Sequence, residues 1–189
     1  MQSLCKIFIL SVFVFSFSNC TSQTKTQDNA QASGRKAESR ASNSALADQL
    51  KTIFDHYFAI KDALVKTDGA LASTHALALV SSLGAIKMDE LSKEEHTSWM
   101  KVEKNLKSDA GQISETKDAG QQRDHFTTLS RDMAVLMKAS KQTEKVYLQH
   151  CPMFNDGKGA DWLSKESNIK NPYYGNKMLT CGKTVETIQ

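Results

Sequence analysis

Between Leu46 and Met137, apolar residues recur at intervals of three and four positions, and this spacing constrains the fold more than any other feature of the sequence. The spacing places apolar side chains on one face of an α-helix. We predict four amphipathic helices, at residues 45–66, 71–86, 92–113 and 119–139. The links between them are short, which favours antiparallel neighbours. The predicted fold class is therefore mainly α, a four-helix bundle at residues 45–140.

Local signals support these boundaries. Asp68-Gly69 separates the first two helices, and Ser92 with Glu95 has the spacing of a capping box at the start of the third. We expect a break in the third helix near Gly111. The side chains expected to face the core include Leu50, Ile53, Phe54, Leu77, Leu79, Leu83, Trp99, Leu106, Phe126, Leu129, Met133 and Met137.

After Ser140 the pattern changes to that of a small β-structure. Residues 145–151 are strand-like, and residues 177–188 read as a second strand interrupted at Gly182. Turn-rich segments separate the two. We predict a small C-terminal β-hairpin and loop extension at residues 141–189, packed on one end of the bundle.

The N-terminus has the pattern of a bacterial lipoprotein leader. Residues 1–19 read as a signal peptide whose apolar run, Ile7–Ser18, is shorter than the about 20 apolar residues that a spanning helix needs. The run ends just before Cys20, which is the expected lipidation site. An ordinary signal peptide is the alternative. Residues 20–44 contain no aliphatic residue larger than alanine and read as a flexible tether behind the lipidated Cys20. We expect a lipid-anchored, periplasm-facing protein of the cell envelope, bound to the inner or outer membrane.

Charge and motifs exclude several function classes. The net charge is +3 with both signs interspersed, and no basic stripe interleaved with aromatics occurs, so we expect no nucleic-acid partner. The sequence has no zinc-protease, phosphate-loop or nucleophile-elbow motif, and we expect no enzyme activity. His56, His75, His96 and His125 fall on predicted helices or their starts and are expected to be surface or core residues.

Soft metal ligands concentrate near the C-terminus. His150, Cys151 and Met153 are followed by Met178 and Cys181, all within 32 residues. Thiolates and thioethers are soft donors that favour Cu(I). In an extended segment Cys151 and Met153 point to the same side, whereas His150 points away unless the following proline turn redirects it.

A disulfide is the competing interpretation of the same cysteines. Cys5 leaves with the leader and Cys20 carries lipid, so only Cys151 and Cys181 remain in the folded part. In an oxidising envelope these two can form a disulfide, which would stabilise the fold by roughly 3–4 kcal/mol on a chain-entropy estimate. The protein would then be a structural or interaction module without metal. Spacing alone leaves both interpretations open.

Residues 46–189 carry a set of features typical of one family: Tyr57-Phe58, Lys61–Leu64, Gln122-Arg123, Phe126, Leu129-Ser130, Met133, Tyr147–Met153, Trp162–Ser164, Ile169–Gly175 and Met178–Gly182. In these features the chain resembles an uncharacterised family of envelope proteins from Bacteroidota-type bacteria. The family's domain occurs alone or fused to periplasmic adaptors of copper and silver efflux systems, and it ends in a Cys-Pro-Met and Met-x-x-Cys-Gly motif.

The resemblance implies copper binding and favours the metal site over the disulfide. We expect Cys151, Met153, Met178 and Cys181 to hold Cu(I), with His150 as an auxiliary ligand. The expected function is metal homeostasis or efflux, and a copper-efflux adaptor is an expected partner.

Overall fold

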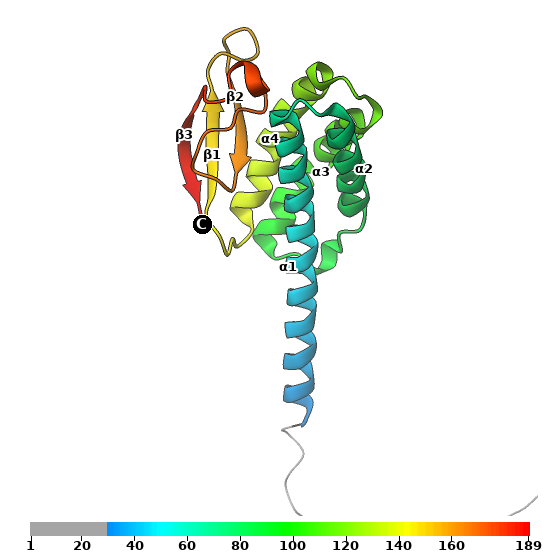
Figure 1. Cartoon of the computed structure of the whole chain (residues 1–189). Helices are drawn as coiled ribbons and strands as arrows, with labels where there is room; N and C mark the ends of the chain where they lie inside the picture. Colours follow the sequence, from blue (N-terminus) through cyan, green and yellow to red (C-terminus); the bar gives the residue numbers. More distant parts are fainter. Residues whose placement is uncertain (1–29) are drawn as a thin grey trace, which may run out of the picture.

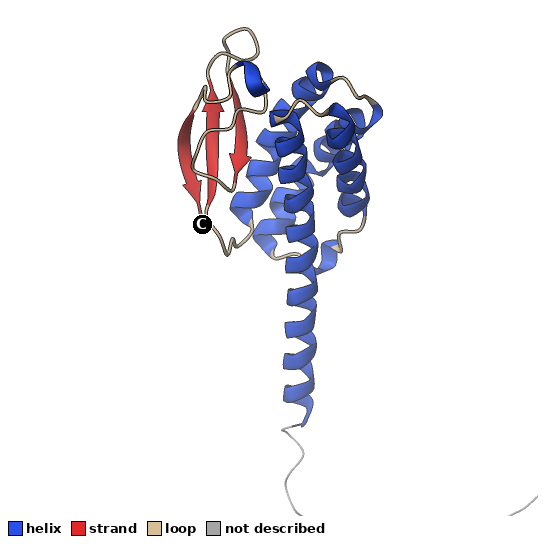
Figure 2. Cartoon of the chain, in the orientation of Figure 1, coloured by secondary structure: helices blue, strands red, loops and turns tan. Residues whose placement is uncertain are grey.

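The computed structural model describes residues 30–189, with side chains described from residue 46 onward. The predicted signal peptide, the lipidation site Cys20 and the first part of the tether lie outside these residues. Four α-helices are followed by three β-strands (Figures 1 and 2). The elements are α1 Ala30–Val65, α2 Gly69–Gly84, η1 Met88–Glu90, α3 Lys93–Glu115, α4 Ala119–Ala139, β1 Val146–Cys151, β2 Ala160–Ser164, η2 Gly175–Lys177 and β3 Lys183–Ile188. The prediction of a mainly α fold with a C-terminal β-extension is confirmed.

The starts of three helices are fixed by side-chain caps. The carboxylate of Asp68 accepts a hydrogen bond from the backbone N–H of Leu71 at the start of α2. Ser92 and Glu95 form the predicted capping box of α3. Asp118 caps α4 in the same way as Asp68 caps α2. Each cap satisfies a backbone donor that has no partner within the helix, and it therefore fixes where the helix begins.

The first helix is longer than predicted. Residues 30–44, expected to be flexible tether, continue α1 toward the N-terminus, and this half of the helix projects from the bundle (Figure 1). The segment contains several alanines and no proline, and extending an existing helix is far easier than nucleating a new one. Among the residues described, no helix is both long and apolar enough to cross a membrane.

Two details of the predicted helices are wrong. The structure has no break at Gly111, and α3 continues to Glu115 because its neighbours Ala110 and Ile113 are fully buried in the core. This packing outweighs the roughly 1 kcal/mol that a helical glycine costs. Leu77, expected in the core, is 61% exposed. The buried face of α2 contains Ala76 and Leu79, and the side chain of residue 77 points to another face of the helix because successive residues are rotated around its axis.

The C-terminal extension is a three-stranded sheet, not a hairpin. Both pairings are antiparallel and the order is β2-β1-β3, so β1 is the central strand. No strand was predicted at residues 160–164, which form β2. The predicted second strand begins only at Lys183, because residues 175–181 form turns in which Cys181 N–H donates to the carbonyl of Met178.

Side chains of the bundle hold this sheet in place. The hydroxyl of Tyr57, fully buried on α1, accepts a hydrogen bond from the N–H of Leu163 in β2 at 3.0 Å and pairs with the hydroxyl of Ser130 at 2.8 Å. Burial is the main reason that the pKa of Tyr57 is raised far above its usual range. Arg123 of α4 donates through Nε to the carbonyl of Pro172 and through Nη2 to the carbonyl of Leu64. The bundle and the sheet are therefore linked through buried polar contacts.

Candidate functional site

The two cysteines of the folded part meet at one end of the sheet. Cys151 is the last residue of β1, and Cys181 follows the turn that begins at Met178. Their Sγ atoms lie 3.9 Å apart, and both are free thiols. The structure therefore brings together two of the five predicted ligands, from positions 30 residues apart in the chain.

Gly182 allows Cys181 to approach β1 this closely. Its φ is +141°, a conformation that L side chains rarely adopt. A Cβ atom at this position would lie 2.8 Å from the carbonyl oxygen of His150 and 2.9 Å from Cη2 of Trp162. Only glycine fits between the central strand and the buried indole, so the chain turns into β3 directly after the thiol.

Asn171 fixes the other side of the same turn. Its side-chain amide donates to the carbonyl of Cys181 at 2.8 Å, and its Oδ1 accepts from the N–H groups of Tyr173 and Tyr174. Its backbone N–H donates to the carbonyl of Leu179. Asn171 is fully buried, so these hydrogen bonds are protected from water. The sequence predicts the interruption at Gly182 that the structure shows, whereas it gives Asn171 no role at the site, although the Asn-Pro pair is the signal that points to it.

The two thiols differ in their surroundings. Cys151 is fully buried, whereas Cys181 is half-buried. Desolvation, and then the neighbouring Cys151 thiol, raise the pKa of Cys181. A raised pKa keeps Cys181 protonated at neutral pH, so any metal that binds as a thiolate complex must displace a proton. Metal binding at this pair would therefore strengthen as pH rises.

His150 does not join the two thiols. It lies opposite Asp161 in the β1–β2 ladder, and its Nδ1 is 2.7 Å from Oδ1 of that carboxylate. Its ring packs over Gly159, on the opposite face of the strand from Cys151 because side chains alternate along a strand. Among the described residues, no three His, Cys, Asp or Glu side chains gather closely enough to hold a metal ion.

The two methionines lie in the segments that carry the cysteines. Met153 is in the turn after β1 and is 57% exposed, and its carbonyl accepts a hydrogen bond from the hydroxyl of Tyr174. Met178 is half-buried at the start of the turn that ends in Cys181. Methionine is unbranched and has three rotatable bonds, so thioethers at these positions can adjust to a neighbouring ion.

Aromatic side chains cover the segment that leads to the thiols. Trp162 is fully buried and packs edge-on against Tyr173, with ring centroids 6.0 Å apart. Tyr173 in turn stacks on Phe154 at 4.5 Å and contacts Phe126 of the bundle. Tyr173 therefore packs this segment against the bundle.

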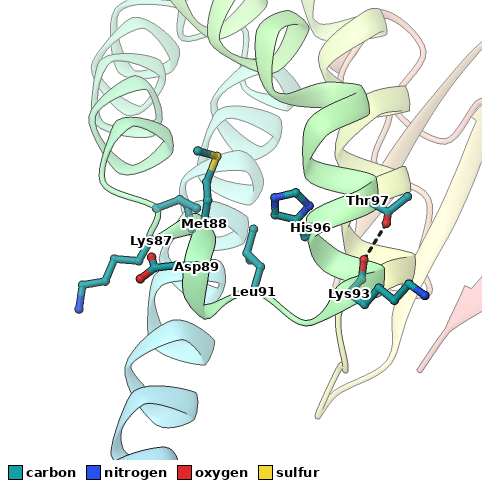
Figure 3. A pocket seen from close by; sticks show the side chains of 8 residues that line it. Lys87, Met88, Asp89, Leu91, Lys93, His96 and Thr97 are labelled. Carbon is teal, nitrogen blue, oxygen red and sulfur yellow. Dashed lines mark hydrogen bonds between the residues drawn. The ribbon is translucent and has the colours of Figure 1, made fainter.

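Two hollows of the described surface lie away from the thiols. One is a groove of about 1170 Å³ whose lining includes Phe54 of α1, Ala139 at the end of α4 and Val146 at the start of β1. Cys151 is at the far end of β1, about 17 Å away at the usual rise of a strand. The second, of about 780 Å³, surrounds η1 and the start of α3, where Met88, Leu91 and His96 contribute to its walls (Figure 3). Neither hollow contains the thiol pair.

Together, the fold and the site define a helical bundle with an appended antiparallel sheet that carries a dithiol. Residues 53–145 match the model of a family described as "Protein of unknown function (DUF3347)". The match covers 93 of the 189 residues, from within α1 to the residue before β1. The thiol pair therefore lies outside the matched region. Comparisons with curated proteins and with solved structures found no match.

Proposed function

We propose that this chain is a membrane-tethered envelope lipoprotein that binds Cu(I), or a similar soft metal ion, through Cys151 and Cys181. One observation carries the proposal: two free thiols from distant parts of the chain lie 3.9 Å apart. If each sulfur were about 2.3 Å from the ion, a usual metal–thiolate distance, this separation gives a sulfur–metal–sulfur angle of about 115°. Such an angle suits a three- or four-coordinate ion, so the donor pair fits without rearrangement of the backbone.

The thioethers complete the proposed ligand set. Met153 and Met178 would add soft donors that need no deprotonation. Because Cys181 is half-buried and Met153 is exposed, the ion would remain accessible to an exchanging partner from that side. His150, whose ring nitrogen is engaged by Asp161, would orient the strand and not bind the ion.

The proposed role is metal homeostasis or efflux without enzymatic activity. A lipid on Cys20 would hold the domain at the periplasmic face of a membrane, and the projecting half of α1 would set its distance from the bilayer. A copper-efflux adaptor protein is the proposed recipient of the ion. The sulfur chemistry and the resemblance in residues 147–182 support this role.

Anaerobic Cu(I) titration against a competing chelator tests the proposal. The starting chain carries Cys5→Ser and Cys20→Ser, so that only Cys151 and Cys181 supply thiols. We expect one-to-one binding, and a loss of at least about tenfold in affinity when either remaining cysteine becomes serine, because even loss of a group that only orients a ligand costs about 10- to 100-fold. Absence of Cu(I) binding, or affinity unchanged in both serine variants, would refute the proposal.

The methionines are tested with a matched control. Met153 and Met100 are 57% and 59% exposed, and Met100 lies on α3 away from the thiols. We expect Met153→Ala to weaken Cu(I) binding and Met100→Ala to leave it unchanged. Equal effects of the two substitutions would remove Met153 from the ligand set.

The same 3.9 Å separation also favours a second function, that of a disulfide-stapled interaction module. A small rotation of both side chains would allow a Cys151–Cys181 bond. Counting thiols in protein isolated from its own compartment under acid quench separates the two functions. Two free thiols support metal binding, whereas none supports the module.

A further inference from the structure

Two histidines on neighbouring helices face each other away from the thiol pair. His56 lies on α1 and His75 on α2, and their ring centroids are 6.4 Å apart with an interplanar angle of 36°. Both residues are half-buried, so the pair is open to solvent on one side. The helices approach closely because Ala72 and Ala76, on either side of His75, are fully buried small residues.

This separation suits two imidazoles that share one ion. A metal–nitrogen distance of about 2.0–2.1 Å, as in zinc sites, gives ring centroids up to about 6.4 Å apart when the rings lie on opposite sides of the ion. The observed 6.4 Å lies at this limit. Small rotations about the side-chain bonds would bring the rings into the tighter angles of tetrahedral or square-planar sites. The backbone already holds the two residues at a suitable distance.

We propose that His56 and His75 form a metal site between α1 and α2 for a divalent first-row transition ion, with Cu(II) and Ni(II) as the best-suited ions. Imidazole is a preferred ligand for both, and Cu(II) is the divalent ion of this row that nitrogen sites bind most tightly. Water would complete the coordination from the open side. The site is chemically distinct from the sulfur pair and does not rest on the function proposed for it.

The nearby carboxylate of Asp55 is paired with Lys51 and Lys165. A metal ion requires a neutral ring nitrogen, so the ion would displace any proton held by the pair.

Nickel titration of the full-length chain, purified in mild detergent without an affinity tag, tests the site. Ni(II) is the probe because it does not readily oxidise the thiols, and binding is followed by calorimetry. We expect His56→Ala and His75→Ala each to weaken Ni(II) binding at least about tenfold. His96→Ala, which changes an exposed histidine at the start of α3, is the matched control and should leave the affinity unchanged.

Thermal unfolding supplies the second measurement. An ion that binds only the folded chain raises its melting temperature. Ni(II) should therefore raise the melting temperature of the wild-type chain and of His96→Ala. It should not raise that of His56→Gln or His75→Gln, which keep a polar side chain of similar size. An affinity and a melting-temperature shift that stay the same in both histidine variants would mean that Ni(II) binds elsewhere, such as at Cys151 and Cys181, and would overturn the proposal. Absence of Ni(II) binding by the wild-type chain would also overturn it.

Discussion

Replacing Gly182 with alanine tests how the chain brings the two thiols together. The added Cβ would lie 2.8 Å from the His150 carbonyl oxygen and 2.9 Å from the ring of Trp162. One neighbour is backbone of the central strand and the other is a fully buried indole, so neither can move freely. The φ of +141° adds backbone strain of about 1–3 kcal/mol, and overpacking adds about 1–3 kcal/mol. Because the chain relaxes partly, we expect the free energy of unfolding to fall by about 3 kcal/mol.

Urea unfolding of Gly182→Ala beside Gly111→Ala measures this effect. A Cβ at Gly111, within α3, would meet nothing within 4 Å. That substitution should therefore stabilise the chain by about 0.5–1 kcal/mol through helix propensity alone. Gly182→Ala should also slow oxidative coupling of Cys151 to Cys181, because relieving the clash moves Cys181 away from β1. The reasoning would be refuted if the free energy of unfolding of Gly182→Ala lay within about 0.5 kcal/mol of wild type and its cysteines coupled oxidatively at the wild-type rate.

Three further predictions concern buried polar groups and pH. Gln122→Ala should lower the free energy of unfolding by about 2–3 kcal/mol in urea. The buried Gln122 amide at the start of α4 donates to the carbonyls of Gly69, Ile113 and Thr116, and so links the start of α2 to the end of α3. Tyr57→Phe should cost about 1–3 kcal/mol in the same assay by leaving the Leu163 N–H unpaired, and an unchanged unfolding midpoint would mean that water replaces the hydroxyl. The pKa of His56 is lowered in the folded chain, so the unfolded chain binds the His56 proton more readily. The contribution of neutral His56 to the free energy of unfolding is therefore present above the unfolded pKa of about 6.5, and it is lost as pH falls through the folded pKa. Urea midpoints at neutral and mildly acidic pH should therefore fall less in His56→Gln than in wild type, and parallel curves would contradict the assignment.

The helices could be predicted from the sequence where local signals agreed with packing. Residues 119–139 were assigned to a helix, and α4 has the same bounds, because Asp118 caps it and its apolar face is continuous. Leu77 was misplaced because apolar residues occur on both faces of α2, and only the positions of the neighbouring helices decide which face is buried. The extension of α1 through residues 30–44 was missed because its composition was read as that of a linker.

Strand β2 could not be predicted because tertiary contacts define it. Its five residues have no clear alternation, and they become a strand through pairing with β1 and through the hydrogen bond from Leu163 to Tyr57. Without β2 the sequence indicated a hairpin, in which β1 would have been an edge. The observed sheet makes β1 central, and Cys151 at its end is buried for that reason.

At the candidate sites, the residue types could be predicted from the sequence, but the contacts between residues far apart in the chain could not. Residue types identified Cys151 and Cys181 as possible partners, but spacing left metal and disulfide open, and the 3.9 Å contact depends on Gly182 and Asn171. The alternation of β1 also explains why His150 faces away. His56 and His75 had no local signal as a pair, because their meeting depends on how α1 and α2 are rotated against each other.

The region matched by the family model ends just before β1, so the match includes the bundle but not the segment that carries the thiols. The matched helices supply Tyr57 and Arg123, whose hydrogen-bond partners Leu163 and Pro172 lie in the unmatched extension. The bundle therefore provides the platform for the sheet, while the sulfur donors belong entirely to the extension. Under the proposed function, substitutions at Cys151 or Cys181 should change metal binding with little effect on the helices, whereas loss of the Tyr57 or Arg123 contacts should change both.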